Sequence, residues 1–130
     1  MKNYNLAYNT IGLNDYKVME RFLKKRKYLN QSVYTKNFEN KFSKFLGTRN
    51  SVFVNSGSSA NLLMAQVLLE GRFLKNKTVV LPAVSWSTSV SPFIQLGYKV
   101  ILCDCDKYNL GLCTYDLEKI CKKFNPGLVL

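Results

Sequence analysis

The stretch of the chain with the clearest chemical potential runs from Val52 to Asn61 and reads VFVNSGSSAN. A short apolar run passes through a glycine turn into a helical segment, so the free N–H groups of the first helical turn would converge at one point. Gly57 leaves room for a ligand to approach the backbone, and Ser58 and Ser59 add hydroxyl donors. This pattern predicts a cup for an anion such as a phosphate. The alternative is that the two serines only cap the helix.

A second stretch, residues 81–92, holds the only tryptophan of the chain, Trp86. It follows a predicted strand, and open α/β sheets bind their ligands at the carboxyl ends of their strands. We therefore expect Trp86 to lie on the same rim of the sheet as the cup. An aromatic face beside a phosphate cup suits a planar phosphorylated ring. The alternative role for Trp86 is to anchor its loop in the core.

Other catalytic patterns fit the sequence less well. The chain contains no histidine, which excludes a Ser-His-Asp triad, a Cys-His pair and a histidine-bearing zinc site within it. Residues 57–61 approach the GxSxG motif of hydrolases, but Asn61 replaces the last glycine. A Walker A loop and the three-glycine dinucleotide motif are both missing. General acid or base chemistry would fall to carboxylates, lysine or tyrosine.

The pattern of apolar runs after Gly47 predicts a parallel α/β sheet. Short runs that do not alternate with polar residues are typical of strands buried on both faces, and they lie at residues 51–54, 78–81, 100–103 and 128–130. Helical patterns lie between them, at residues 60–70, 88–96 and 115–124. The first of these helices is apolar nearly all round, which indicates burial, and Pro92 must lie in the first turn of the second or kink it. Two further helices are predicted in front of the sheet, at residues 15–29 and 36–46.

These patterns predict an N-terminal helical segment at residues 1–50 and an α/β domain at residues 51–130. The last apolar run ends at Leu130 without a polar cap, and a bare edge strand of that kind is an aggregation hazard. We therefore expect the chain to be the N-terminal piece of a longer protein, with the α/β domain truncated at its C-terminal end.

The charge of the chain is strongly positive. Its 19 Lys and Arg residues against 8 Asp and Glu residues give a net charge of +11 and a pI near 9.6. Most of the excess lies in residues 1–50 and is densest in the run KKRK at residues 24–27. Such a run can bind nucleic acid, but at the end of an amphipathic helix it is more often a solvated face that complements the helix dipole. We favour the solvated face and keep a basic nucleic-acid-binding module as an alternative function.

The cysteines and the N-terminus indicate the compartment. The four cysteines, at positions 103, 105, 113 and 121, form no CxxC pair, and the N-terminus lacks the apolar stretch of a secretory signal. This favours reduced thiols in the cytoplasm. Cys103 and Cys105 would share one strand face and could bind a metal, but simple packing of two small side chains is the preferred interpretation, so we expect no metal site. The apolar runs are too short to span a bilayer, so neither a transmembrane segment nor a membrane partner is expected.

Four segments, in this order and at this spacing, resemble one known family. They are Asn55 to Leu63, Pro82 to Thr88, Ile94 to Gly97 and Leu102 to Asp106. Together they are similar to the N-terminal third of the DegT/DnrJ/StrS sugar aminotransferases, which belong to the fold-type I superfamily of pyridoxal-phosphate enzymes. The resemblance covers the chain from Thr35 to its end. It implies the N-terminal part of the large domain of such a transferase, with a mostly parallel sheet and flanking helices.

The resemblance also implies a set of cofactor-binding residues: Gly57, Ser58, Ser59, Ser85, Trp86 and Ser87. The first three would bind the phosphate of pyridoxal 5'-phosphate, Trp86 would stack on its pyridine ring, and the serines on either side of Trp86 would lie beside the cofactor or substrate. The family usually has Thr-Ala where this chain has two serines, and the hydroxyl at the first position is kept. Asp104 and Asp106 match an Asp-x-Asp pair of the family, which we interpret as loop capping.

The function that the resemblance implies is amination of a nucleotide-linked 4-keto sugar in polysaccharide or lipopolysaccharide biosynthesis, with glutamate as amino donor and a homodimer as the active form. The lysine that binds the cofactor lies beyond the position of Leu130 in this family, so no residue of the chain is assigned a catalytic role. A related subgroup has histidine in place of that lysine and acts as a sugar 3-dehydratase. The sequence leaves this alternative open, together with that of a non-catalytic phosphate-binding domain.

Overall fold

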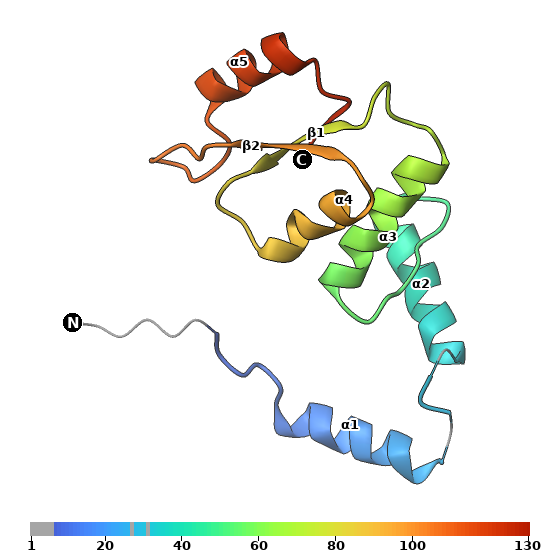
Figure 1. Ribbon diagram of the computed structural model, residues 1–130. Helices are drawn as coiled ribbons and strands as arrows, with labels where there is room; N and C mark the ends of the chain where they lie inside the picture. Colours follow the sequence, from blue (N-terminus) through green and yellow to red (C-terminus); the bar gives the residue numbers. More distant parts are fainter. Residues whose placement is uncertain (1–6, 27, 31) are drawn as a thin grey trace, which may run out of the picture. The chain divides into compact units, whose positions relative to one another are not determined.

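The computed structural model describes residues 7–26, 28–30 and 32–130. The chain divides into two compact units, Met1–Phe53 and Val54–Leu130. Within its described residues, the first unit contains two helices, and the second unit contains a parallel sheet with its own helices (Figure 1).

The helices of the first unit are α1 (Leu13–Lys24) and α2 (Val33–Leu46), and local signals set their ends. Ser32 caps α2 by accepting a hydrogen bond from the N–H of Tyr34 at 3.3 Å. Gly47 ends α2 with a φ of +70°, a left-handed conformation that glycine adopts without a steric penalty. Helix α1 ends five residues before the predicted end at residue 29, and Arg26, with a φ of +49°, interrupts the helical path just beyond it.

The strand predicted at residues 51–54 does not form, because this segment pairs with α2 instead. The N–H of Phe53 donates to Oε1 of Glu39 at 2.8 Å, and the Phe53 ring contacts Phe38 edge-on with centroids 5.4 Å apart. Among the residues that the structure describes, no strand lies beside this segment. The prediction was wrong because a strand needs a hydrogen-bonding neighbour, which an apolar pattern cannot supply.

The second unit is built on three parallel strands in the order β2-β1-β3. They are β1 (Thr78–Pro82), β2 (Lys99–Cys103) and β3 (Leu128–Val129). Strand β1 lies in the middle, and Val79, Val80 and Leu81 are fully buried. The continuous apolar run of β1 therefore reflects burial on both faces of the sheet.

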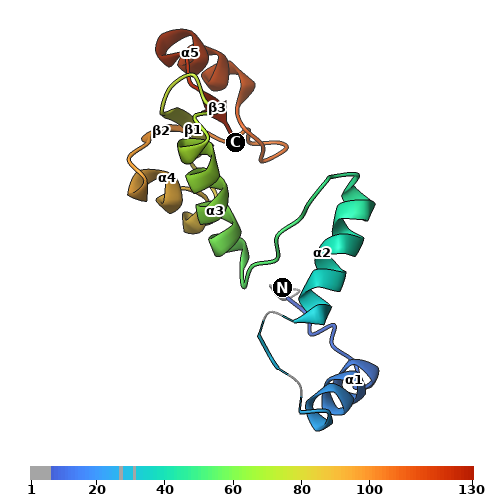
Figure 2. The same cartoon turned by 90° about the vertical axis from the view of Figure 1, so that its right-hand side faces the viewer.

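Helices cover both faces of this sheet, as Figures 1 and 2 show: α5 (Thr114–Phe124) lies on one face, and α3 (Gly57–Glu70) and α4 (Ser91–Gln95) lie on the other. The predicted helix at residues 88–96 is divided into a short 3-10 helix, η1 (Ser87–Ser89), and α4. Pro92 lies in the first turn of α4, as expected. The α/β fold with a parallel sheet and flanking helices, preceded by two N-terminal helices, is thus confirmed.

The core of the second unit is formed by side chains from α3, β1, α4 and the turn that follows α4: Ala65, Val79, Leu81, Phe93 and Tyr98. The hydroxyl of Tyr98 donates to the carbonyl of Ala65 at 2.9 Å, which ties the turn to α3. On the other face of α3, Leu63 and Val67 are 42% and 50% exposed in this chain, so the burial expected for this helix in a larger body is seen here on one face. Among the described helices, none combines the length and the apolar character needed to cross a bilayer.

Candidate functional site

The start of α3 is capped by Ser56. Its side-chain oxygen accepts a hydrogen bond from the N–H of Ser59 at 3.1 Å, and its carbonyl accepts one from the N–H of Ala60 at 3.1 Å. The helix therefore has its cap one residue before Gly57. Ser58 is therefore not needed as a cap, whereas Ser59 takes part in the capping turn through its N–H.

A chain of hydroxyl hydrogen bonds fixes the shape of the turn. The hydroxyl of Ser56 donates to Oγ of Ser59 at 3.2 Å, and the hydroxyl of Ser59 donates to Oδ1 of Asn55 at 2.6 Å. Both donors of Ser59, its N–H and its hydroxyl, are thus bound within the turn. Sequence reasoning did not single out Asn55, although its position four residues before Ser59 is a usable signal for such a contact.

Three donors at this turn remain available to a ligand. The N–H groups of Gly57 and Ser58 and the hydroxyl of Ser58 have no hydrogen-bond partner in the part of the chain that the structure describes. Both residues are exposed, and a Cβ built on Gly57 would meet no atom within 4 Å. Neither packing nor a left-handed backbone requires glycine at this position, whereas a ligand in close contact with the backbone would.

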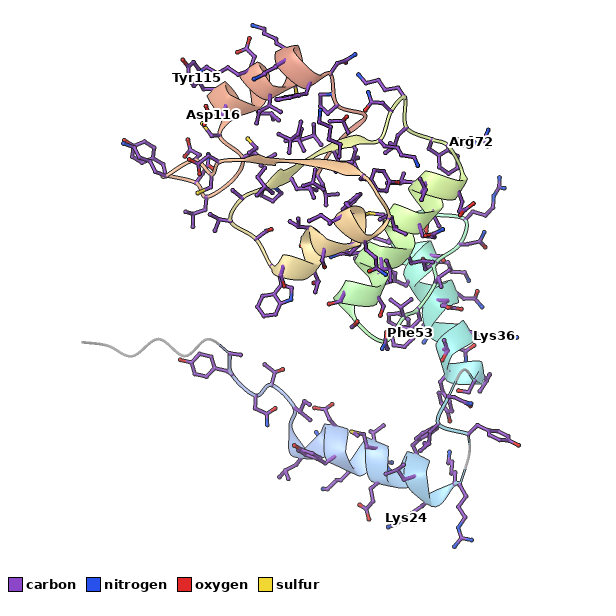
Figure 3. All side chains as sticks on the ribbon, in the orientation of Figure 1. Lys24, Lys36, Phe53, Arg72, Tyr115 and Asp116 are labelled. Atoms are coloured by element: carbon purple, nitrogen blue, oxygen red, sulfur yellow. The ribbon has the colours of Figure 1, made fainter. Side chains whose placement is uncertain are left out.

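The electrostatics of this helix start favour an anion. The first turn of α3 contains no acidic side chain, whereas the first turns of α1 and α5 contain Asp15 and Asp116. Figure 3 shows Asp116 at the N-terminal end of α5. The positive end of the α3 dipole is therefore not neutralised by a side chain of that turn. Two N–H groups and a hydroxyl at such an end are suitable donors for a phosphate, so the residues present fit the phosphate of pyridoxal phosphate.

Trp86 is 76% exposed and does not anchor its loop in the core. It lies beyond the carboxyl end of β1 and precedes η1, where its carbonyl accepts a hydrogen bond from the N–H of Ser89 at 2.8 Å. The neighbouring Ser85 donates its hydroxyl to the carbonyl of Pro82 at 3.3 Å, and Ser87 is the exposed first residue of η1. An exposed indole is available for stacking on a planar ring.

One side-chain hydrogen bond connects the turn at the start of α3 with the Trp86 segment. The amide nitrogen Nδ2 of Asn61 donates to the carbonyl of Thr88 at 3.1 Å, although the two residues are 27 positions apart in the chain. The structure thus brings the first turns of α3 into contact with the segment that follows Trp86. It also adds Asn61, to which sequence reasoning gave no role in the site.

The two aspartates after β2 shape their own loop. Oδ1 of Asp104 accepts a hydrogen bond from the N–H of Cys105 at 2.8 Å, and Oδ1 of Asp106 accepts from the N–H groups of Tyr108 and Asn109 at 2.8 and 3.0 Å. Their interpretation as loop-capping residues is confirmed.

The cysteines are all free thiols. Cys103 is buried at the end of β2 and donates to the carbonyl of Cys113 with a 3.7 Å contact. Burial raises the pKa of the Cys103 thiol, and the charge of Asp116 raises it further. Cys103 therefore packs as a small apolar side chain. In the ranges described, no group of three or more His, Cys, Asp or Glu side chains is placed to hold a metal ion.

The basic run lies at the C-terminal end of α1, where Figure 3 labels Lys24. The Lys24 ammonium forms an ion pair with Glu20, four residues earlier, at 2.7 Å, and both side chains are mostly exposed. Arg21 and Lys24 in the last turn complement the helix dipole. These positions support the solvated face; Lys27 lies outside the described residues.

A parallel sheet with helices on both faces is the α/β fold expected for part of a fold-type I pyridoxal-phosphate enzyme. Residues 9–128 match the DegT/DnrJ/EryC1/StrS aminotransferase family. The chain belongs to this family, and the resemblance expected from the sequence is confirmed.

Two curated proteins to which the chain is similar are named as 3-dehydratases. The chain is 36% identical over 123 residues to GDP-4-keto-6-deoxy-D-mannose 3-dehydratase of Escherichia coli O55:H7, an alignment that covers 92% of this chain and 31% of that protein. It is 36% identical over 124 residues to the enzyme of the same name from Yersinia pseudotuberculosis, with 92% and 30% covered. The chain thus spans about a third of the length of these relatives.

Solved structures agree with this relationship. A crystal structure of GDP-4-keto-6-deoxymannose-3-dehydratase with a trapped PLP-glutamate geminal diamine superimposes with a TM-score of 0.71 at 33% identity, covering 90% of this chain and 31% of that one. A mutant of that dehydratase with bound GDP-perosamine superimposes equally well, with the same identity and coverage. The family is therefore one of pyridoxal-phosphate enzymes, and one of its solved members binds a GDP-linked sugar.

Proposed function

We propose that this chain is the cofactor-binding part of a pyridoxal-phosphate-dependent 3-dehydratase that acts on a nucleotide-linked 4-keto-6-deoxy sugar. The observation that carries the proposal is the set of three donors at Gly57 and Ser58 that have no hydrogen-bond partner among the described residues. Asn61 connects their helix to the segment of the exposed Trp86. A phosphate group and a planar ring are the two chemical features that this arrangement suits.

The choice of dehydratase over aminotransferase is supported by the relatives. The two proteins that align with nearly the whole chain are both named as 3-dehydratases of a GDP-linked 4-keto sugar. The amination that the sequence first suggested remains the second candidate, because the family includes enzymes of that activity. Both reactions use the same cofactor, so the role proposed for the residues of this chain is the same in either case.

The part played by this chain is binding and orientation. The N–H groups of Gly57 and Ser58 and the Ser58 hydroxyl would hold the phosphate at the positive end of α3. Trp86 would cover one face of the ring, with Ser85 and Ser87 at its edges. Ser59 would act by keeping the turn in shape, through its bonds to Asn55 and Ser56. When bound, the cofactor supplies the electron sink that makes chemistry next to the sugar ketone feasible.

Fluorescence of the chain's single tryptophan tests the cofactor site. The ligand is pyridoxine 5'-phosphate, which has the phosphate and the ring but no aldehyde that could react with the lysines. We expect saturable quenching of Trp86 that inorganic phosphate competes away. Absence of quenching in a chain whose far-UV circular dichroism shows it to be folded would contradict the proposal.

The reaction type is tested on the native protein, incubated with pyridoxal phosphate, glutamate and GDP-4-keto-6-deoxymannose. Mass spectrometry of the sugar distinguishes the outcomes. Loss of the 3-hydroxyl oxygen is the expected result. Gain of an amino group at C4 would favour the aminotransferase, and an unchanged sugar would contradict both.

We propose that the enzyme works in the cytoplasm, which suits its free thiols, and that it assembles as a homodimer. Its substrates would be the nucleotide-linked sugar and an amino donor such as glutamate. Sedimentation of the native protein with and without the cofactor tests the assembly.

A further inference from the structure

We infer that Asn61 is a positioning residue that sets the place of Trp86 relative to the phosphate cup, and this inference rests on the proposed function of the cup. The Asn61 side-chain amide donates to the carbonyl of Thr88 at 3.1 Å. This bond starts on the helix that would hold the phosphate and ends on the segment that would hold the ring.

The bond reaches the Trp86 segment within η1. Thr88 is the middle residue of η1, a helix of only three residues. Trp86 directly precedes this helix. Within η1 the carbonyls of Trp86 and Ser87 are bonded to the N–H groups of Ser89 and Val90. The carbonyl of Thr88 has the Asn61 amide as its partner among the described residues. Such a short helix has few internal hydrogen bonds, so an outside donor contributes strongly to its position.

The hydrogen bond between Asn61 and Thr88 lies in a more buried place than the residues before it. The bond is partly buried, whereas Val84 and Trp86 are 70% and 76% exposed and have little packing to hold them. After η1, Val90 packs against the core, so the segment is anchored at its far end. Asn61 thus supplies a hydrogen bond from α3 to this segment two residues after Trp86.

A fixed distance matters because the expected ligand has its phosphate and ring joined covalently. If the cup and the indole are held in the correct relation beforehand, both groups bind without a further ordering cost. A free phosphate uses the cup alone and gains nothing from the position of Trp86. Asn61 should therefore affect the affinity for the phosphorylated ring and leave the affinity for phosphate unchanged.

The test compares two ligands on the variant Asn61→Ala. Calorimetry measures the binding of pyridoxine 5'-phosphate, and the amide NMR shift of Ser58 measures the binding of inorganic phosphate. We expect the first affinity to fall about three- to tenfold, the range of one neutral hydrogen bond, and the second to stay as in the parent chain. The matched control is Gln66→Ala on the same helix, whose side-chain amide donates to Glu70 and not to the Trp86 segment. It should change neither affinity.

A double-mutant cycle separates positioning from a general structural effect. In the Trp86→Ala background, Asn61→Ala should cause no further loss of ring-ligand affinity, because the group that it positions is gone. Additive losses, equal losses for both ligands, or no loss would each overturn the inference. If Asn61→Ala does not fold, Asn61→Leu, which fills a similar volume and cannot donate, is expected to give the same result. A parent chain that fails to bind pyridoxine 5'-phosphate would instead refute the proposed function.

Discussion

The hydroxyl of Ser59 donates to Oδ1 of Asn55 at 2.6 Å. Its proton is therefore used within the turn and is not available to a ligand. The adjacent Ser58 is exposed, and its hydroxyl and N–H have no partner among the described residues. Two neighbouring serines, alike in sequence, therefore have different roles: Ser59 builds the cup, and Ser58 is available to bind in it.

Replacement of Ser58 by alanine should weaken ligand binding without loss of stability. A hydroxyl that donates to a charged phosphate makes a stronger hydrogen bond than a neutral pair, so we expect about a tenfold loss of pyridoxine 5'-phosphate affinity. Calorimetry checks the affinity and urea unfolding checks the stability. The control is Ser91→Ala at the exposed start of α4, which should leave both unchanged. Equal affinities for the Ser58→Ala variant and the parent would remove Ser58 from the site.

Replacement of Ser59 by alanine should instead destabilise the turn. The variant loses the donor to Asn55 and the acceptor for Ser56, so the free energy of unfolding should fall by about 1 kcal/mol. A shift of the urea midpoint at an unchanged slope is the measurement. If Ser59→Ala unfolds at the same urea concentration as the parent, the hydroxyl chain does not hold the turn.

Gly57→Ala should separate stability from binding. Its Cβ meets no protein atom within 4 Å, and alanine is the better helix former, so stability should stay equal or rise by about 0.5 kcal/mol. The added methyl group lies where the phosphate would approach, so affinity should fall at least about tenfold, since one lost charged contact is of that size. Unaltered affinity in calorimetry would show that the ligand does not approach Gly57.

The contrasting glycine is Gly127, just before β3. A Cβ there would lie 2.4 Å from the backbone oxygen of Asn76, which cannot move without displacing β1. Gly127→Ala should therefore lower the free energy of unfolding by about 1–3 kcal/mol, as overpacked sites do. Urea unfolding should therefore show equal or higher stability for Gly57→Ala and lower stability for Gly127→Ala.

Buried Cys103 should make stability fall at alkaline pH. Burial raises the pKa of its thiol above the ordinary value, so the folded chain keeps this proton to a higher pH than the unfolded chain. The stabilisation is then complete below the ordinary thiol pKa of about 8.5 and is lost as the pH rises through the raised value. Unfolding at a series of pH values up to about 9.5, below the ordinary tyrosine pKa of about 10, checks this. The free energy of unfolding should fall less steeply with rising pH in Cys103→Ala than in the parent chain. The same pH dependence in both proteins would contradict the prediction.

The helices were predictable because their signals are local. Apolar spacing located α2 and α5, and Gly47 marked the end of α2 through the left-handed φ that it adopts. The end of α1 was missed because Leu29 continues the apolar spacing beyond the turn at Arg26. Local spacing does not reveal where the backbone leaves the helical path.

Contacts between distant segments were not predictable in the same way. The run at residues 51–54 has the composition of a strand, but the Glu39 carboxylate binds its backbone at Phe53. The cup was found because its residues are adjacent in sequence. The bond between Asn61 and Thr88 spans 27 positions, with no periodic pattern to indicate it, and so only the folded structure identifies Asn61.

The most direct test of the proposed cofactor site is an amide NMR titration of the 130-residue chain with pyridoxine 5'-phosphate. If the start of α3 holds the phosphate and the indole covers the ring, the largest shifts should occur at the N–H groups of Gly57 and Ser58 and at the indole Nε1–H of Trp86. Shifts concentrated at the basic end of α1 or at the start of α5, or no saturable shifts in a folded chain, would contradict it.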